Sequence, residues 1–297
     1  IDTDFRGLTT TSWVTPDGEV LKEQSPLGWE LVREPQDRAM ESATALAPAP
    51  DLLSTLAVPI DRTLDDPPRL TRLVWLVEGA DPGALALGRS WQTVLPPEQL
   101  ADRYRTDPPA GAWSLVELRR AAPPSPDATH ASVPSGVERY RRPSPFVQSD
   151  DERITAQARE VVGTISDPWD QAVGLSHWVH RALTKRLTVG LPSATDVLAS
   201  KSGDCHEHTI LFTALARSVG LPTRMVAGLV YYEGRLYYHA WPEVWLGGWV
   251  PTDPTLGQPV ADATHLGLVE AENEQLISLA TFVGQLRVKV LEVEHAH

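Results

Sequence analysis

The chain has 297 residues, of which 42% are hydrophobic, and a formal net charge of −13. This length and composition fit one large or two ordinary globular domains, and the acidic balance argues against partners such as duplex nucleic acid or anionic lipid, which require a basic surface. A single cysteine excludes an internal disulfide, and no apolar run approaches the roughly 18 residues of a membrane span.

The compartment and the oligomeric state stay open. The chain starts at Ile1 rather than Met, and removal of a leader or anchor would explain that start. An extracytoplasmic or periplasmic location would follow from such a removal. A lone cysteine does not discriminate between compartments, so a cytoplasmic location is equally open.

A stretch rich in Pro, Ser and Ala divides the chain. It reads AAPPSPDATHASVPSGVERYRRPSP from Ala121 and has no apolar period, which is typical of an extended linker. We therefore predict a β-rich accessory domain over 1–120, a Pro-rich linker over 121–149 and a second domain over 150–297.

The first part has a strand bias and no cluster of catalytic residue types. Asp17-Gly18 lies between two strand-like runs and predicts a hairpin. The segment 69–79 has the composition of a strand, and 51–57 is compatible with one short helix. An accessory role, such as positioning a substrate or covering a cleft, is the expectation for this part.

The second part opens with three helices. The first covers DDERITAQAREVVGTI (150–165), where apolar residues recur at helical spacing. The second begins at Asp167 as N-cap and Pro168 as first helical residue. The third runs from Asp204 to Gly220, where Gly and a following Pro end it.

Strands follow the helices. They are predicted in TRMVAGLVYY, RLYYHAWPEVWL, WVPTD and the C-terminal QLRVKVLEVE, with turns at Glu233-Gly234 and Gly247-Gly248. Helices first and antiparallel strands after them indicate an α+β fold.

The only cysteine lies at the start of the third helix. Asp204 and Glu207 form a capping-box pattern around Cys205, and the helix behind it is apolar on nearly all sides, as a buried central helix is. A helix N-terminus favours the thiolate over the thiol. The alternative is a structural buried cysteine, which is common.

A thiol nucleophile needs a base, and the base needs a carboxylate that orients it. His239 in the strand YYHAWPEVW and Asp253 in WVPTDPT supply these two groups in chain order. A two-residue turn at Gly247-Gly248 would point Asp253 away from His239, since strand side chains alternate. We therefore predict a bulge near Pro242 or Pro251 that restores the face.

The segments GDCHEHTILFTALARSVGLPTRMVAGLVY and YHAWPEVWLGGWVPTDPT resemble the transglutaminase-like superfamily, especially its bacterial members. The resemblance covers about residues 150–275. It implies a papain-like core, with the cysteine on a central helix against an antiparallel sheet, and a catalytic domain over 150–297. Cys205, His239 and Asp253 match the family's nucleophile, base and orienting carboxylate.

The resemblance also implies acyl transfer through a thioester. The sequence has no calcium-loop pattern, Gly-rich phosphate loop or cofactor fingerprint, so we predict catalysis without a cofactor or metal. The backbone N–H of Cys205 is the expected oxyanion donor, and His208, about 60° from Cys205 on the helix wheel, is a candidate lining residue. Trp169 and Trp178 are aromatic candidates for a second donor, although helix packing explains them more simply. Hydrolysis of a peptide, isopeptide or other amide bond in a protein or peptide substrate is the predicted reaction.

Three alternatives remain at this point. The thioester could pass to an amine, as in a protein cross-linking transglutaminase. The chain could be a non-catalytic protein- or peptide-binding module, with a groove formed by the aromatic residues Tyr231, Tyr232, Tyr237, Tyr238, Trp241 and Trp245. Zinc could bind in CHEH (205–208) or HWVH (177–180), although His206 and His208 lie about 200° apart on a helix and fit one metal poorly.

Overall fold

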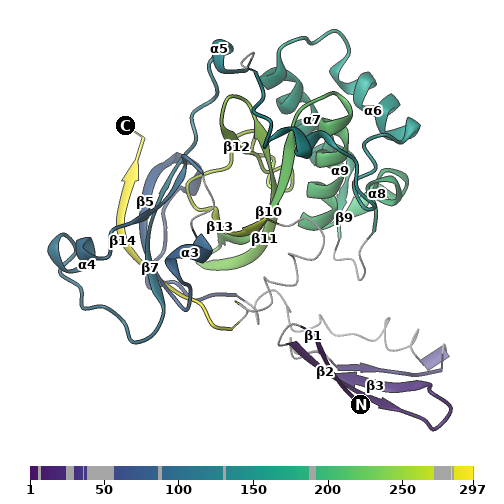
Figure 1. Ribbon diagram of the computed structural model, residues 1–297, viewed down its shortest axis with the longest axis horizontal. Coiled ribbons are helices and arrows are strands. Elements are labelled where there is room, and N and C mark those ends of the chain that lie inside the picture. The colour runs from purple at the N-terminus through teal and green to yellow at the C-terminus, as the bar shows by residue number, and fades with distance from the viewer. Residues whose placement is uncertain are drawn as a thin grey trace.

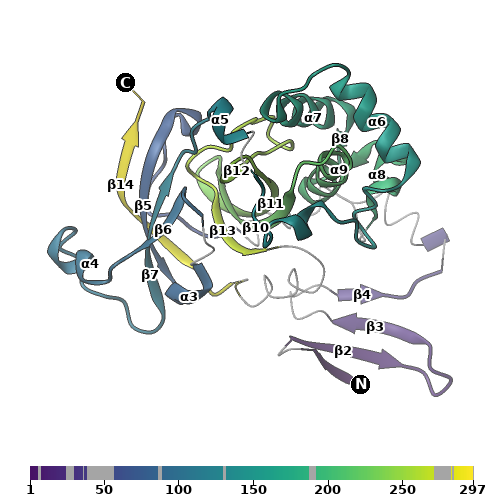
Figure 2. The same cartoon turned by 45° about the horizontal axis from the view of Figure 1, so that its top comes forward.

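The computed structural model describes residues 1–5, 8–24, 30–35, 37–38, 57–85, 89–129, 132–186, 192–270, 282 and 284–296. Helices gather on one face of a central sheet, and a second sheet lies on its other side (Figure 1; Figure 2). The fold is therefore α+β, as the sequence predicts. None of the helices in these ranges is long and apolar enough to cross a bilayer.

Four helices build the part of the molecule that carries Cys205. They are α6 (Glu152–Val162), α7 (Pro168–Ala182), α8 (Ala194–Ser200) and α9 (Cys205–Ser218). Each begins at a polar side chain that accepts a hydrogen bond from a first-turn N–H; these caps are Asp151, Asp167, Ser193 and Asp204. Such caps satisfy donors that the helix itself leaves unpaired. The three helices predicted from sequence are confirmed, and α8 is an addition.

The central sheet is antiparallel, with strand order β12-β11-β10-β13. Its strands are β10 (Thr223–Tyr232), β11 (Arg235–Trp245), β12 (Trp249–Pro251) and β13 (Leu266–Glu270). Nearly all of β10 is buried, because the sheet is covered on both faces. A strand covered on both sides reads as a continuous apolar run, which is how TRMVAGLVYY reads.

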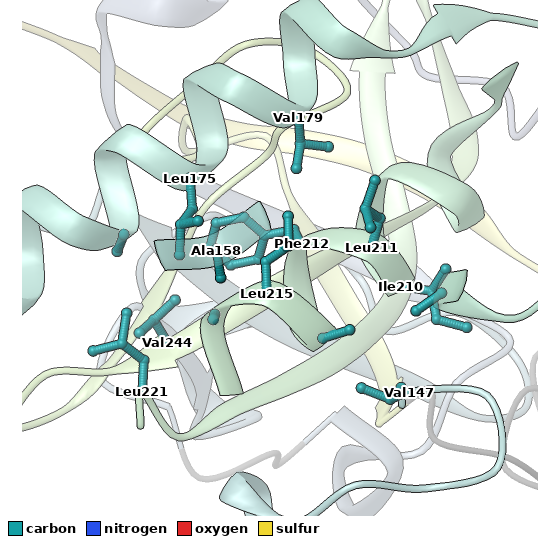
Figure 3. Close-up of a cluster of buried hydrophobic side chains, with 14 of the residues drawn as sticks. Val147, Ala158, Leu175, Val179, Ile210, Leu211, Phe212, Leu215, Leu221 and Val244 are labelled. Carbon is teal, nitrogen blue, oxygen red and sulfur yellow. The ribbon is translucent and has the colours of Figure 1, made fainter. Parts of the chain in front are cut away.

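Helix α9 is the centre of the first core. Its residues Ile210, Leu211, Phe212 and Leu215 are fully buried, and side chains of the surrounding helices and strands pack around them (Figure 3). Ahead of α9, β9 (Ser202–Gly203) pairs in parallel with β8 (Thr184–Lys185) at the end of α7. This pairing ties the start of α9 to the end of α7.

The second sheet has strand order β14-β5-β7-β6. Its strands are β5 (Leu70–Glu78), β6 (Gln92–Leu95), β7 (Trp113–Arg119) and β14 (Arg287–His295), joined with the short helices η1 (Pro67–Arg69), α3 (Pro82–Leu85) and α4 (Glu98–Asp102). The predicted second domain, 150–297, ends in a strand that belongs to this second sheet. Strand β14 pairs with β5 rather than with the sheet of His239, because its Val288 and Val290 are buried in the core beside β5.

The segment predicted as a linker, 121–149, contains short helices and contributes to a hydrophobic core. It contains α5 (Pro126–Thr129) and η2 (Glu138–Arg141), and its residues Tyr140 and Val147 are buried. Val147 belongs to the core around α9. This stretch therefore packs along the helical part of the molecule while it connects the two halves.

The two sheets share a second hydrophobic core. It joins Trp75 of β5 and Val116 of β7 with Leu229, Trp241 and Leu266 of the central sheet. A buried ion pair crosses the same boundary: Arg89 Nε lies 2.5 Å from Glu243 Oε1, and both side chains are fully buried. Glu243 also pairs with Arg224 at 2.7 Å.

A separate four-stranded meander forms the N-terminal part. Its strands are β1 (Asp2–Phe5), β2 (Leu8–Val14), β3 (Val20–Gln24) and β4 (Glu30–Val32), in that order. Gly18, with φ of 87°, lies in the β2–β3 turn, so the predicted hairpin is confirmed. The strand predicted over 69–79 is β5, and the helix predicted over 51–57 lies almost wholly outside the described residues.

Candidate active site

Cys205 is the first residue of α9 and is half-buried. The Asp204 side chain accepts a hydrogen bond from the N–H of His206 at 2.9 Å, and Glu207 Oε2 accepts one from the N–H of Asp204 at 2.8 Å. A Cβ at position 203 would collide with the Glu207 side chain. Gly203 therefore allows Glu207 to close the capping box, which fixes the backbone on both sides of the thiol.

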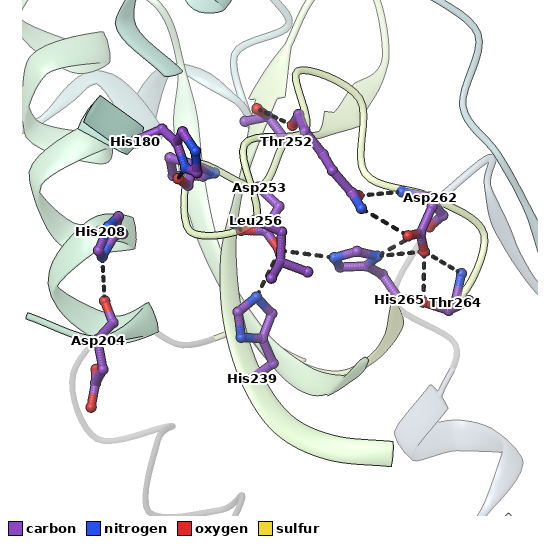
Figure 4. A network of polar contacts seen from close by, with 12 residues as sticks. His180, Asp204, His208, His239, Thr252, Asp253, Leu256, Asp262, Thr264 and His265 are labelled. Carbon is purple, nitrogen blue, oxygen red and sulfur yellow. Dashed lines mark hydrogen bonds and ion pairs between the residues drawn. The ribbon is translucent and has the colours of Figure 1, made fainter. Parts of the chain in front are cut away.

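His239 of β11 lies between Cys205 and Asp253. Its Nε2 is 2.7 Å from Asp253 Oδ2, and the carboxylate is fully buried (Figure 4). The Cys205 thiol is close enough to His239 to contribute to raising the pKa of the imidazole. Because Nε2 is taken by the carboxylate, Nδ1 is the ring nitrogen left for the thiol. The structure thus brings the three predicted residues together.

The turn between β11 and β12 determines which way Asp253 points. Trp245 pairs with Trp249, so the loop Leu246–Gly248 has three residues rather than two. This register places Asp253 diagonally across from His239 and on the same face of the sheet. The bulge predicted near Pro242 or Pro251 is wrong: the ladder runs without a shift as far as Pro251, and the extra loop residue has the same effect.

The loop that carries Asp253 is held in place by α7. Asp253 and Gln258 exchange two backbone hydrogen bonds of 2.8 Å, which close a tight turn. His180 Nδ1 donates to Pro254 O at 2.9 Å, and a Cβ on Gly257 would lie 2.9 Å from the same ring. His180 therefore supports the loop of Asp253.

Two residues outside the predicted site extend the polar network. His265 Nε2 lies 3.1 Å from Asp253 Oδ2, and its Nδ1 lies 3.1 Å from Asp262 O (Figure 4). Both residues are buried. The sequence reasoning missed them, although the segment DATH, with Asp and His three residues apart just before an apolar strand, was the available signal.

Burial and mutual contact shift the pKa values of three groups in this network, His239, His265 and Asp253. Burial lowers the pKa of His239, but the charge and hydrogen bond of Asp253, aided by Cys205, raise it to about 10. Burial likewise lowers the pKa of His265, and Asp253 and Asp262 raise it to about 9. Burial raises the pKa of Asp253, yet His239 and His265 bring it far below its ordinary value. These shifts favour the protonated form of both histidine rings at neutral pH.

Two carboxyl groups, those of Asp204 and Glu207, lie close to each other in the turn that carries Cys205. Burial, followed by the hydrogen bond and charge of Glu207, raises the pKa of Asp204 to about 7. Glu207 is 2% exposed. Two carboxyl groups this close share a proton near neutral pH, so the negative charge beside Cys205 changes in the physiological range.

His208 is turned toward the start of its own helix. It is fully buried, and its Nδ1 donates to the carbonyl oxygen of Asp204 at 2.6 Å (Figure 4). Its Nε2 has no hydrogen-bond partner within the part of the chain that the structure describes. Burial lowers the pKa of His208, which fits a neutral ring that buttresses the N-terminus of α9.

One group of residues has the arrangement of metal ligands. Among the described residues, only His239, Asp253 and His265 place ligand atoms within 4.8 Å of one another. The sets predicted in CHEH and HWVH do not assemble there. Hydrogen bonds within the cluster account for its geometry, since both Nε2 atoms already lie at bonding distance from Asp253.

Most of the aromatic residues that were candidates for a groove or a second oxyanion donor pack against neighbouring strands and helices. Trp241 is fully buried. Tyr231 is buried as well, and its hydroxyl oxygen accepts a hydrogen bond from the N–H of Leu64 at 2.9 Å. Tyr232 is exposed and lies edge-on to Tyr237. Trp169 and Trp178 pack against the core around α9. These positions favour sheet and helix packing over a continuous aromatic groove.

Comparison with known proteins gives a family for the segment that holds this site. Residues 155–254 match the family model of the transglutaminase-like superfamily. A search of curated proteins finds no match.

Among solved structures, a candidate cysteine protease from Cytophaga hutchinsonii matches with 15% identity, covering 76% of this chain and 86% of its own, at a TM-score of 0.48. The periplasmic domain of TgpA from Pseudomonas aeruginosa matches with 16% identity over 68% of this chain and 87% of its own, at 0.41. Red sea bream transglutaminase matches with 12% identity over 68% of this chain and 48% of its own, at 0.35. The family match itself is confined to residues 155–254, and this segment of the transglutaminase-like superfamily includes Cys205, His239 and Asp253.

Proposed function

We propose that the protein is a thiol acyl-transfer enzyme that hydrolyses an amide bond, in a peptide, isopeptide or related substrate, through a thioester. The observation that carries the proposal is the arrangement of three residues. Cys205 begins α9, and the Nε2 atom of His239 lies 2.7 Å from Oδ2 of the buried Asp253. A helix N-terminus and an imidazolium ion both stabilise a thiolate.

The first half of the reaction forms the thioester. The Cys205 sulfur attacks the amide carbonyl carbon, and the negative charge on the carbonyl oxygen is met by the backbone N–H of Cys205. The carbon–nitrogen bond then breaks, and the leaving amine takes the proton of His239. Asp253 holds the ring so that Nδ1 faces the reacting atoms.

The second half consumes the thioester. His239, now neutral, takes a proton from water as the water oxygen attacks the acyl carbon. The carbon–sulfur bond breaks, and the products are a carboxylic acid and the Cys205 thiolate paired with imidazolium. An amine in place of water gives the transfer reaction, so the acceptor alone separates a hydrolase from a cross-linking enzyme.

The first test is the rate of iodoacetamide alkylation of Cys205 against pH, in the protein and in His239→Ala. We expect rapid labelling that persists below about pH 7 and is lost in the variant, because the imidazolium stabilises the thiolate. The lone cysteine makes the mass increase unambiguous. His177→Ala, at an exposed position of α7, is the matched control. Slow labelling that is unaffected by His239→Ala would contradict the proposal and favour a binding module.

The acceptor is tested with a glutamine-containing protein, with and without a labelled primary amine. We expect deamidation or peptide cleavage to exceed amine incorporation, and Cys205→Ala to abolish both. Incorporation that exceeds hydrolysis would instead indicate the cross-linking reaction.

A further inference from the structure

His265 is a buried histidine that a three-residue mechanism does not use. It directly precedes β13, and its ring reaches the same oxygen of the Asp253 carboxylate as the ring of His239 (Figure 4). The side chains of His265 and Asp253 are fully buried, and that of Asp262 is only 5% exposed. A buried ionisable ring needs partners for its polar atoms.

The partners of the His265 ring determine its protonation. Nε2 faces Asp253 Oδ2 at 3.1 Å, and Nδ1 faces the carbonyl oxygen of Asp262 at 3.1 Å and its Oδ1 at 3.3 Å. A carbonyl or carboxylate oxygen only accepts hydrogen bonds, whereas a neutral imidazole has a single N–H. Both nitrogens are therefore satisfied only when both carry a proton.

The two carboxylates are not in a position to supply that proton. Asp253 Oδ2 also accepts from His239, and Oδ1 accepts from the N–H of Leu256 at 2.9 Å. Asp262 Oδ1 accepts from the N–H and the hydroxyl of Thr264, and its Oδ2 accepts from Gln258. Carboxylates surrounded by donors remain ionised.

We propose that His265, held by Asp262, is a second imidazolium on the Asp253 carboxylate and a positioning residue for the reaction. It fixes Asp253 between two rings and limits how strongly Asp253 retains the proton on His239. The proposal rests on the proposed function, because it assigns a role within that chemistry.

The physical reason is competition between two cations for one anion. The His239 and His265 rings lie 6.0 Å apart and both bond to Oδ2 of the same carboxylate. Like charges at this distance repel, so each ring makes the other a better proton donor. A base that later protonates a leaving group works best when it does not hold its proton too tightly.

Charged and aromatic groups face His265 from three neighbouring parts of the fold. Strand β11 presents His239 and the edge of Trp241, with ring centroids at 6.0 and 5.0 Å. The loop after β12 presents Asp253, and the turn before β13 presents Asp262. The two carboxylates raise the pKa of His265 to about 9 against the effect of burial.

The first measurement needs no substrate. Nitrogen-15 NMR of the histidine rings should show a buried ring, besides His239, that carries protons on both nitrogens between pH 6 and 8. His265→Gln identifies that signal by removing it, and His177→Gln should leave it in place. A neutral His265 tautomer at pH 7 would overturn the proposal even if the variant fails to fold.

The second measurement separates a charge effect from a structural one. Glutamine at position 265 retains an N–H donor for Asp253 but carries no charge, so the midpoint of proton loss from His239 should rise by about one pH unit. On an amide substrate, kcat should fall about tenfold with KM unchanged. An unchanged or lowered His239 midpoint contradicts the proposal. Absence of turnover in the unmodified protein would instead contradict the proposed function and leave the NMR result standing.

Discussion

Asp204 performs two tasks at the residue scale. Its side chain caps α9, and it forms with Glu207 a carboxyl pair one residue before the thiol. Capping needs only a hydrogen-bond acceptor, whereas the pair brings a titration near neutral pH. An asparagine keeps the acceptor and removes the charge, so the two tasks can be separated.

We predict that Asp204→Asn flattens the dependence of thermal stability on pH between about 4.5 and 6. The folded pKa of Asp204, about 7, lies above its ordinary value of 3.8, so its contribution is full at low pH and declines as pH rises through this window. The slope is at most about 1.4 kcal/mol per pH unit, the value for one proton, and smaller because the carboxyl is partly exposed and screened by solvent.

The measurement is the melting temperature by circular dichroism at several pH values. The window lies below the ordinary pKa of histidine, 6.5, so His239 and His265 are protonated in both folded and unfolded states. Asp196→Asn is the matched control, because Asp196 closes the capping box of α8 but its pKa is lowered. An equal slope in the protein and in Asp204→Asn would show that Asp204 does not titrate there.

At the element scale, one loop residue decides whether the site forms. The loop Leu246–Gly248 sets the register of β12 against β11, and with it the face on which Asp253 lies. A register shift of one residue moves every side chain of a strand to the opposite face. Gly247, with φ of 80° and Ala128 close by, is the constrained position of the loop, whereas a Cβ at Gly248 meets no atom within 4 Å.

We therefore predict that deletion of Gly248 separates Asp253 from His239, while Gly248→Ala changes neither stability nor reactivity. The deletion should lower the pKa of His239 from about 10 toward its ordinary 6.5, as seen by NMR titration, and should reduce turnover about a thousandfold. A His239 midpoint that stays near 10 in the deletion variant would mean that the loop does not set the register.

The same elements show what the sequence determines and what it leaves open. Helix α9 and its capping box were predictable, because Asp204 and Glu207 act within one turn. Asp253 was placed correctly beside His239, but the predicted cause was a bulge, whereas the structure has a three-residue loop. The length of that loop depends on how Gly247 packs, which the sequence alone does not show. His265 was missed because its partner Asp253 belongs to another segment, even though its other partner, Asp262, lies three residues before it. The pairing of β14 with β5 joins residues too far apart in sequence for local patterns to reveal.

At the scale of the whole molecule, the central sheet depends on cover from both sides. Helix α9 covers one face, and the second sheet covers the other with Trp75 and Val116 packed on Leu229 and Trp241. The buried Glu243 is neutralised partly by Arg89, which comes from the N-terminal half. The accessory half is thus part of the structure that holds His239, whatever its role toward a substrate.

We predict that a chain starting at residue 121 does not fold, whereas one starting at residue 39 keeps its stability and its thiol reactivity. The first truncation exposes the apolar face of the central sheet and leaves Glu243 without Arg89, and a broken buried ion pair costs about 3–5 kcal/mol. The second removes only the meander β1–β4, whose ladders are internal to it. Solubility, circular dichroism and alkylation rates would compare them; a folded, reactive chain from residue 121 would contradict this account.

The pairing of β14 with β5 has a consequence for the newly made chain. Residues 70–78 leave the ribosome long before residues 287–295, and Cys205, His239 and Asp253 are all synthesised between them. Strand β5 therefore lacks its partner strand β14 at the time when Cys205, His239 and Asp253 have already been made. Such distant contacts make folding slow, and they delay a fully covered, stable site until synthesis has passed β14.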